Sequence, residues 1–259
     1  MLIKHVSDFN IEQIADSGQC FRIDKVTDGK WRLRAFNREL EISQRQEEVR
    51  FDCSAEEFDA VWFDYFDMSR DYGAIKSSIL ALGDEYLSAA VKFGYGLRIL
   101  RQDLWETIVS FIISQRNNIP KIKNTISKLC HDSVHFPSVA ELAEFSDDKL
   151  KSCGLGYRAK YVKDLAQNVR NGSFDLDKLK KLNYTQAIDY LKTQSGVGDK
   201  VANCVALFGL HKTEAFPVDV WIKRIIDTYY NGHFDASKFK DYAGIVQQYM
   251  FYYERAKGK

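Results

Sequence analysis

The chain has 259 residues, of which 45% are hydrophobic and 28% charged, with a formal net charge of +1. This composition is typical of a folded protein of one or two domains with a substantial core, and it excludes a largely disordered chain. It contains no apolar run long enough to span a membrane, so we expect no membrane partner. Because the net charge is near zero, a nucleic-acid partner would have to bind a local basic face.

Residues 1 to about 53 show the two-residue alternation that is typical of β-strands. Trp31 and Leu33 alternate with arginines. The dipeptide Asp28-Gly29 is a turn signal between two such runs. This pattern predicts a small antiparallel β domain at the N-terminus.

The period changes at Ser54, where Ser54 to Glu57 has the form of a capping box that opens a helix with Phe58 and Trp62 on one face. Helical patterns follow at about 71–82, 85–93, 102–116, 120–131, 138–145, 157–171, 185–194, 199–208, 220–230 and 236–255. The predicted fold class is therefore α+β, with a β-rich domain at 1–96 followed by a mostly α-helical domain at 97–259. Residues 54–96 could in part join the first helical bundle.

The cysteines indicate reduced thiols in an intracellular protein. Their number is odd and no pair has C-x-x-C spacing. They form no cluster that would favour a zinc or iron–sulfur site, so we expect no metal site. The five residues are Cys20, Cys53, Cys130, Cys153 and Cys204.

A glycine-rich turn between two helical patterns carries the clearest chemical signal. Gly196 and Gly198 predict a tight turn whose backbone N–H groups bind a phosphate. Lys200 falls in the first turn of the next helix, where the helix dipole favours the neutral, nucleophilic amine. Asp219 adds a carboxylate if the chain folds back. The alternatives are an ordinary helix–helix turn, a solvated lysine and an aspartate that only caps a helix.

Further segments share their order with one enzyme family. They are 17–22 (S-G-Q-C-F-R), 96–103 (G-L-R-I-L-R-Q-D), 110–119 (S-F-I-I-S-Q-R-N-N-I), 155–162 (L-G-Y-R-A-K-Y-V) and 243–251. With the glycine turn and Asp219, they resemble the 8-oxoguanine DNA glycosylases of the helix-hairpin-helix superfamily, from about residue 8 to 253. The resemblance implies a monomeric enzyme that flips 8-oxoguanine out of double-stranded DNA, excises it and nicks the abasic site by β-elimination.

The resemblance also implies the roles of the two catalytic residues. Lys200 matches the family's catalytic lysine, which attacks the sugar C1′, expels the damaged base and leaves a Schiff base. Asp219 matches the aspartate that stabilises positive charge on the sugar or orients the lysine. It is expected to cap the following helix as well. No cofactor is required for this chemistry.

Four residues match the family's base pocket. The backbone carbonyl of Gly18 would accept the N7 hydrogen that oxidised guanine has and guanine lacks, and Cys204 and Phe251 would sandwich the flipped base. Gln247 would read its Watson–Crick edge, and it shares a helix face with Phe251 because the two are four residues apart. The alternatives are a plain turn glycine for Gly18 and a small buried core residue for Cys204.

Another set is expected to bind the DNA around the lesion. Arg116, Asn117 and Tyr157 are candidates for the wedge that fills the hole, and Arg158 for the contact to the opposite base. The alternative for Tyr157 is an aromatic packed on the core at a helix start. The full expected set is Arg116, Asn117, Lys121, Tyr157, Arg158, Gly196, Gly198 and Trp221. The local basic face could comprise Lys121, Lys123, Arg158, Lys160, Lys163, Lys200, Lys223 and Arg224, unless these are solvated helix residues.

Three positions depart from the family pattern. Arg116 replaces an asparagine, Lys121 replaces an arginine that reads the opposite cytosine, and Trp221 replaces a histidine. These changes put the selectivity for cytosine in doubt. Two other functions stay open: a helix-hairpin-helix glycosylase for another lesion, such as an alkylated purine, and a non-catalytic DNA-binding module.

Overall fold

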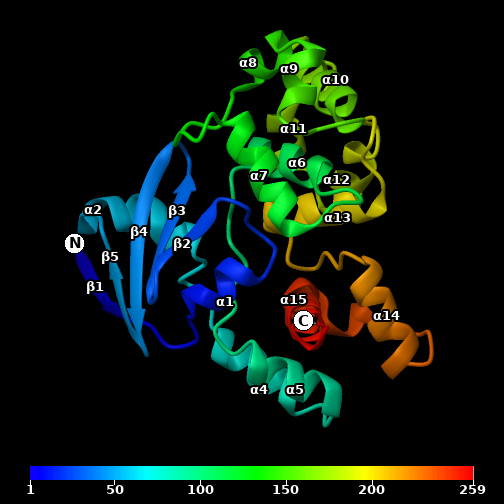
Figure 1. The fold of residues 1–259 in the computed structure, drawn as a ribbon. Helices are drawn as coiled ribbons and strands as arrows, with labels where there is room; N and C mark the ends of the chain where they lie inside the picture. The colour runs from blue at the N-terminus through cyan, green and yellow to red at the C-terminus, as the bar shows by residue number, and fades with distance from the viewer. Residues whose placement is uncertain (259) are drawn as a thin grey trace.

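A computed structural model describes residues 1–258. Its N-terminal part is a five-stranded antiparallel sheet in the order β1-β5-β4-β3-β2 (Figure 1). The strands are β1 (Leu2–His5), β2 (Ile23–Thr27), β3 (Lys30–Ala35), β4 (Arg38–Arg45) and β5 (Glu48–Phe51). The β3 residues alternate between buried and half-buried, and the Asp28-Gly29 turn joins β2 to β3, as predicted.

One helix interrupts the predicted strand region. Helix α1 (Ile11–Asp16) lies between β1 and β2, which the strand alternation did not predict. The Asn10 side chain accepts a hydrogen bond from the Gln13 backbone N–H and caps the helix. Ile11 and Ile14 are buried at helical spacing, but the helix is too short for a clear period.

Short helical turns after the sheet close its core. They are α2 (Ala55–Glu57), the π-helical turn η1 (Phe58–Trp62) and α3 (Phe63–Tyr65). The Ser54 side chain caps α2 by accepting from the Glu57 N–H at 3.1 Å. The Glu57 carboxylate accepts from the Trp62 indole N–H at 3.2 Å. Phe58 and Trp62 are fully buried against the sheet, as the sequence predicted.

The rest of the described chain is helical. Its elements are α4 (Tyr72–Leu80), α5 (Glu85–Phe93), α6 (Leu104–Ile113), α7 (Ile119–Leu129), α8 (Val139–Glu144), α9 (Asp147–Ser152), α10 (Arg158–Arg170), α11 (Leu176–Lys181), α12 (Tyr184–Leu191), α13 (Asp199–Phe208), α14 (Val220–Tyr229), the 3₁₀ helix η2 (Ala236–Tyr242) and α15 (Ala243–Lys257). All ten predicted helical segments are present. The predicted segment 236–255 is two elements, and the chain is also kinked inside η2, where Lys240 has a positive φ of 47°.

The sequence missed α9 and α11. Each has six residues, begins at a side-chain cap (Ser146 and Asp175) and buries one leucine, Leu150 or Leu179. A single buried residue gives no apolar stripe, so no helical period is visible in either segment.

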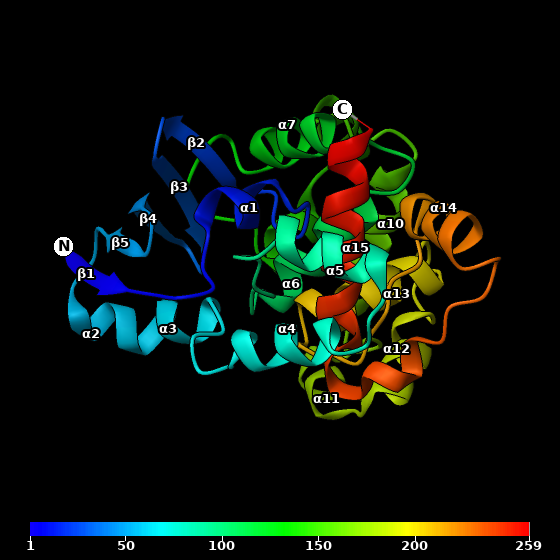
Figure 2. The same cartoon turned by 90° about the horizontal axis from the view of Figure 1, so that it is seen from below.

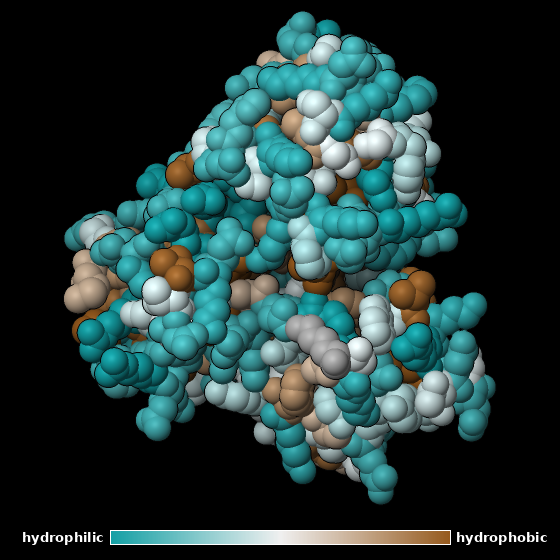
Figure 3. Space-filling model, viewed as in Figure 1, coloured by the Kyte–Doolittle hydropathy of each residue, from teal (hydrophilic) through white to brown (hydrophobic). Residues whose placement is uncertain are grey.

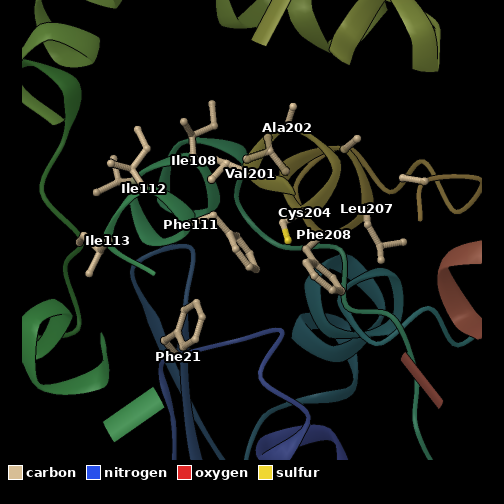
Figure 4. Close-up of a cluster of buried hydrophobic side chains, with 14 of the residues drawn as sticks. Phe21, Ile108, Phe111, Ile112, Ile113, Val201, Ala202, Cys204, Leu207 and Phe208 are labelled. Atoms are coloured by element: carbon tan, nitrogen blue, oxygen red, sulfur yellow. The ribbon is translucent and has the colours of Figure 1, made fainter. Parts of the chain in front are cut away.

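Helix α15 lies at the centre of the helical part. It is seen end-on in Figure 1, with α4 and α5 below it, α14 beside it and the helices α6 to α13 above. Figure 2 shows α15 running alongside α5. Above it, α6 and α13 pack against each other, and the Phe111 and Phe208 rings are stacked with their centres 5.4 Å apart (Figure 4). The Phe21 ring meets Phe111 edge-on, with 5.6 Å between the ring centres.

Two buried polar clusters join the sheet to the helices. The Arg98 guanidinium donates to the carbonyls of Asp8 (2.9 Å) and Asp67 (2.9 Å), and the Gln19 amide bonds to the backbone of the 96–103 segment. Arg22 donates to Glu106 on α6 at 3.2 Å. Burial raises the pKa of the Glu106 carboxyl to about 7, although the Arg22 charge opposes the shift.

The five cysteines are all free thiols and all buried; the sequence predicted reduced thiols but not their burial. Among the helices of residues 1–258, none has both the length and the apolar character that a bilayer span requires.

Candidate active site

Lys200 occupies the first turn of α13, as predicted. Gly198 precedes the helix as its N-cap, and Lys200 is the second helical residue. The Lys200 Nζ lies 3.4 Å from the Ser114 Oγ and 5.3 Å from the centre of the Phe111 ring. Because the Ser114 hydroxyl donates to the Phe111 carbonyl at 2.8 Å, its lone pairs are left to accept from the lysine amine. The end of α6 therefore holds the amine in place.

Asp219 caps α14, as expected. Its Oδ1 accepts from the backbone N–H groups of Trp221 (3.0 Å) and Ile222 (2.9 Å). Burial raises the pKa of the Asp219 carboxyl, while the Ile222 N–H and the Lys200 charge favour its ionised form. The folded chain thus brings the carboxylate within range of the Lys200 charge, nineteen residues away in sequence.

Cys204 lies one helical turn after Lys200 and is 4% exposed. Figure 4 shows its side chain pointing from α13 to the same side as Phe111 and Phe208. Burial raises the pKa of the Cys204 thiol, and the Lys200 charge opposes that shift. The thiol is therefore both a buried core residue and a neighbour of Lys200.

Gly18 lies against α15 in a conformation that favours glycine. Its φ is +76°, and a Cβ there would lie 3.2 Å from Ile119 Cδ1 and 3.4 Å from Phe251 Cε1. Arg255, one turn after Phe251, reaches back to pair with Asp16 at 2.8 Å and lies over the Phe251 ring at 5.7 Å. The turn at Gly18 and the Phe251 ring therefore form adjoining walls.

Gln247 is held by two hydrogen bonds. Its side chain is 3% exposed, and its Nε2 donates to the Pro217 carbonyl at 3.2 Å. Its Oε1 accepts from the Nε2 of Gln248 at 3.0 Å. The Gln247 amide thus lies beside the segment that leads to Asp219.

The predicted wedge residues lie in two loops that touch each other. Arg116 is exposed with a φ of +47°, and the Asn117 amide donates to the Ile113 carbonyl at 3.2 Å. Tyr157 is 53% exposed. Arg158 is buried, and it donates to the carbonyls of Gln115 and Arg116 (3.2 Å) and of Leu155 (3.3 Å). Arg158 thus braces the loop that carries Arg116 and Asn117.

The two glycines of the 196–200 turn have different structural requirements. At Gly196, φ is +79° and a Cβ would lie 2.5 Å from the Tyr161 ring. At Gly198, nothing in residues 1–258 lies within 4 Å of a Cβ. Within the described chain, no side chain caps α13 at Gly198, so its first N–H groups are open to a ligand.

The expected basic face is partly neutralised. Lys123 pairs with Asp24, Lys160 with Asp164 at 2.7 Å and Lys163 with Asp147 at 3.0 Å. Within the described residues, the exposed cations of the expected set that form no ion pair are Lys121, Lys223 and Arg224, the last of which lies 5.0 Å from the centre of the Trp221 ring.

Figure 3 shows a mostly hydrophilic face that is hollowed between the α6–α13 helices and the α14–α15 pair, with hydrophobic atoms visible in the hollow. Helix α13, which carries Lys200 in its first turn, and helix α14, which Asp219 caps, lie on either side of this region (Figure 1).

The sequence did not single out Ser114 and Gln248. Ser114 lies within the 110–119 segment and Gln248 directly follows Gln247. The sequence pattern does not show that Ser114 contacts Lys200 or that Gln248 bonds to Gln247. In the part of the chain that the structure describes, no cluster of three or more His, Cys, Asp or Glu residues could hold a metal ion.

Comparison with known proteins identifies two adjoining regions. Residues 1–108 match the N-terminal domain of 8-oxoguanine DNA glycosylase, and residues 109–241 match the HhH-GPD superfamily of base excision DNA repair proteins.

A probable N-glycosylase/DNA lyase of Methanothermobacter thermautotrophicus is 31% identical over 74% of this chain and 73% of its own length. An N-glycosylase/DNA lyase of Saccharomyces cerevisiae is 37% identical over half of this chain, but that match spans only 41% of the yeast protein. The 8-oxoguanine glycosylase/lyase of Clostridium acetobutylicum was solved with double-stranded DNA containing cytosine opposite 8-oxoguanine. It superposes with a TM-score of 0.92 at 36% identity, over 99% of this chain and 96% of that one.

Proposed function

This chain belongs to the 8-oxoguanine DNA glycosylase/lyase family of the HhH-GPD superfamily, and we propose on that premise that it excises 8-oxoguanine from duplex DNA and nicks the abasic site. The observation that carries the proposal is the placement of Lys200 in the first turn of α13, where its amine meets the Ser114 hydroxyl and its charge favours the ionised form of Asp219. We further propose that the protein acts as a monomer inside the cell.

In the proposed reaction, the neutral Nζ of Lys200 attacks C1′ of the damaged nucleoside. The bond from C1′ to N9 breaks, its electron pair leaves with the base, and the base takes up a proton. The Asp219 carboxylate lowers the energy of positive charge on the sugar, which is the largest kind of catalytic contribution in many enzymes. Ring opening leaves a Schiff base on Lys200. Loss of a C2′ proton then expels the 3′ phosphate.

The chain's own groups hold both catalytic side chains. Ser114 accepts a hydrogen bond from Lys200 and holds the amine. The backbone N–H groups of Trp221 and Ile222 hold the Asp219 carboxylate. No step that we propose passes through a cofactor.

For base recognition, we propose a pocket between the Gly18 turn, Cys204 and α15. The Gly18 carbonyl would accept the N7 hydrogen of the lesion, Phe251 and Cys204 would stack on its two faces, and Gln247 would bond to its Watson–Crick edge. The closeness of Gly18 to the Phe251 ring supports this arrangement, because it places two walls of the proposed pocket side by side.

For DNA binding, we propose that Asn117 and Tyr157 fill the hole left by the flipped base, with Arg116 beside them. The exposed Tyr157 and the strained loop conformation of Arg116 support this role. Arg158 can reach the opposite base only by giving up some of its carbonyl contacts. The open N–H groups at Gly198 are suited to a DNA phosphate. We propose Gly196, Lys121 and Trp221 as further DNA contacts.

Borohydride trapping tests the proposal. The wild-type protein and a duplex with 8-oxoguanine opposite cytosine should give a covalent adduct. Lys200→Gln should bind the duplex but form no adduct, whereas Lys180→Gln, on the exposed surface of α11, should trap like wild type. An adduct in Lys200→Gln would refute the assigned nucleophile. Wild-type protein that binds but never traps would favour the non-catalytic module, and activity on alkylated purines alone would favour the other glycosylase class.

A further inference from the structure

Two consecutive glutamines on α15 form a short buried hydrogen-bond chain. Gln247 and Gln248 are 3% and 4% exposed. The Gln248 Nε2 donates to the Gln247 Oε1 at 3.0 Å, and the Gln247 Nε2 donates to the Pro217 carbonyl at 3.2 Å. Both bonds impose the same orientation on the Gln247 amide, with its oxygen toward Gln248 and its nitrogen toward Pro217.

The orientation of that amide decides which purine edge it can bind. A guanine-type edge presents the O6 acceptor beside the N1–H donor, whereas an adenine-type edge presents the N6 donor beside the N1 acceptor. A glutamine held in one orientation matches one of these patterns and opposes the other, because a flip exchanges its donor and acceptor. A freely flipping amide would accept both. The hydrogen bond from Gln248, which favours one orientation of the Gln247 amide, would therefore affect which lesion the pocket accepts.

Gln248 has an unusual second feature. Its Oε1 is buried and finds no hydrogen-bond donor within residues 1–258. Buried polar atoms are nearly always satisfied, and an unpaired one destabilises the fold. In the described chain the Oε1 acceptor of Gln248 is thus unused, and one of its two N–H donors bonds to Gln247.

We propose that Gln248 is a positioning residue that holds the Gln247 amide in the orientation suited to a guanine-type lesion and so excludes oxidised adenine. This inference rests on the proposed function, because it assigns a selectivity to the same base pocket. Gln248 acts through Gln247. Removing the Gln248 donor leaves only the Pro217 carbonyl to orient the amide.

Gln248→Met tests this directly, because methionine has a similar volume and no hydrogen-bond donor. The measurement is single-turnover excision of 8-oxoguanine and of 8-oxoadenine at several enzyme concentrations, which separates the maximal rate from the half-saturating concentration for each lesion. We expect the preference for 8-oxoguanine to fall by about tenfold, the equivalent of one net hydrogen bond. Gln44→Met is the matched control: it removes amide bonds to the Phe9 and Gln46 carbonyls in the β domain and should leave the preference unchanged.

Gln248→Glu supplies a second readout. A protonated glutamic acid can donate to Gln247 as the amide does, whereas the ionised form can only accept. The rate of this variant relative to wild type on 8-oxoguanine should therefore fall as pH rises.

Two results would overturn the inference: an unchanged preference in folded Gln248→Met, or equal losses on both lesions, which would mark a merely structural residue. If wild-type protein fails to excise 8-oxoguanine, the proposed function itself fails, and that outcome is distinct from both.

Discussion

The same substitution at the two glycines of the 196–200 turn should have different effects: a loss of stability at Gly196 and a loss of DNA affinity at Gly198. Gly196→Ala forces an alanine into a φ of +79°, which costs about 1–2 kcal/mol. Its Cβ would lie 2.5 Å from the Tyr161 ring, and overpacking of this kind costs about 1–3 kcal/mol more. We therefore expect a loss of roughly 2–5 kcal/mol in the free energy of unfolding, or about 4–20 °C in Tm.

Gly198→Ala should leave stability almost unchanged. Its φ is −97° and the space around a Cβ is open within the described structure, so a change within about 0.5 kcal/mol is expected. If the N–H groups that follow Gly198 bind a DNA phosphate, the added methyl group stands in the path of that phosphate. DNA affinity should then fall by about tenfold, a loss comparable to one charge-assisted hydrogen bond.

Urea unfolding followed by tryptophan fluorescence measures the first effect, and fluorescence anisotropy with a duplex measures the second. An unchanged unfolding midpoint in Gly196→Ala would refute the steric reasoning. Wild-type DNA affinity in Gly198→Ala would refute the phosphate contact, since the substitution changes nothing else nearby. Loss of affinity in Gly196→Ala alone decides neither question, because displaced Tyr161 packs against Tyr157 at 6.0 Å.

Asp219→Asn keeps the oxygen that caps α14 but removes the charge, so single-turnover excision should slow by about 10²–10³-fold while duplex affinity holds; an unchanged rate would remove Asp219 from the mechanism. Burial raises the pKa of Glu106 to about 7, above that of an unfolded glutamate, so the folded protein keeps a proton that the unfolded chain releases. The free energy of unfolding should thus fall by up to ~3 kcal/mol as the pH rises from about 4.5 to 7. Urea unfolding of Glu106→Gln should show no such dependence on pH. Log affinity for DNA should fall with log salt despite the net charge of +1, and a flat plot would contradict phosphate binding. Because Lys121 is a flexible point charge where the family has a bidentate arginine, 8-oxoguanine should be excised appreciably opposite bases other than cytosine. Single-turnover rates opposite C, A, G and T check this, and excision confined to cytosine would show that Lys121 is not needed for that selectivity.

Most of the secondary structure could be predicted because its signals are local. The alternation at Trp31 and Leu33 reports one buried face of a sheet, and the helical periods report stripes that pack on a core. Where a segment buries only one residue, as α9 does with Leu150, that signal disappears and the helix is missed.

The position of Lys200 and the cap at Asp219 were also readable from the sequence, because turn glycines and N-caps act within a few residues. The partners of these groups were not. Ser114 lies 86 residues before the lysine that it contacts, and only the packing of α6 against α13 brings them together.

For the same reason, the sequence indicates which residues to expect in the site but not what their side chains contact. The sequence indicates that Gln247 and Arg158 belong to the site, because they stand in recognisable motifs. Only the tertiary structure shows that Gln248 donates a hydrogen bond to the Gln247 amide and that Arg158 donates to backbone carbonyls. Hydrogen-bond direction and burial depend on chain segments that are distant in sequence, and no local pattern encodes which of them will meet.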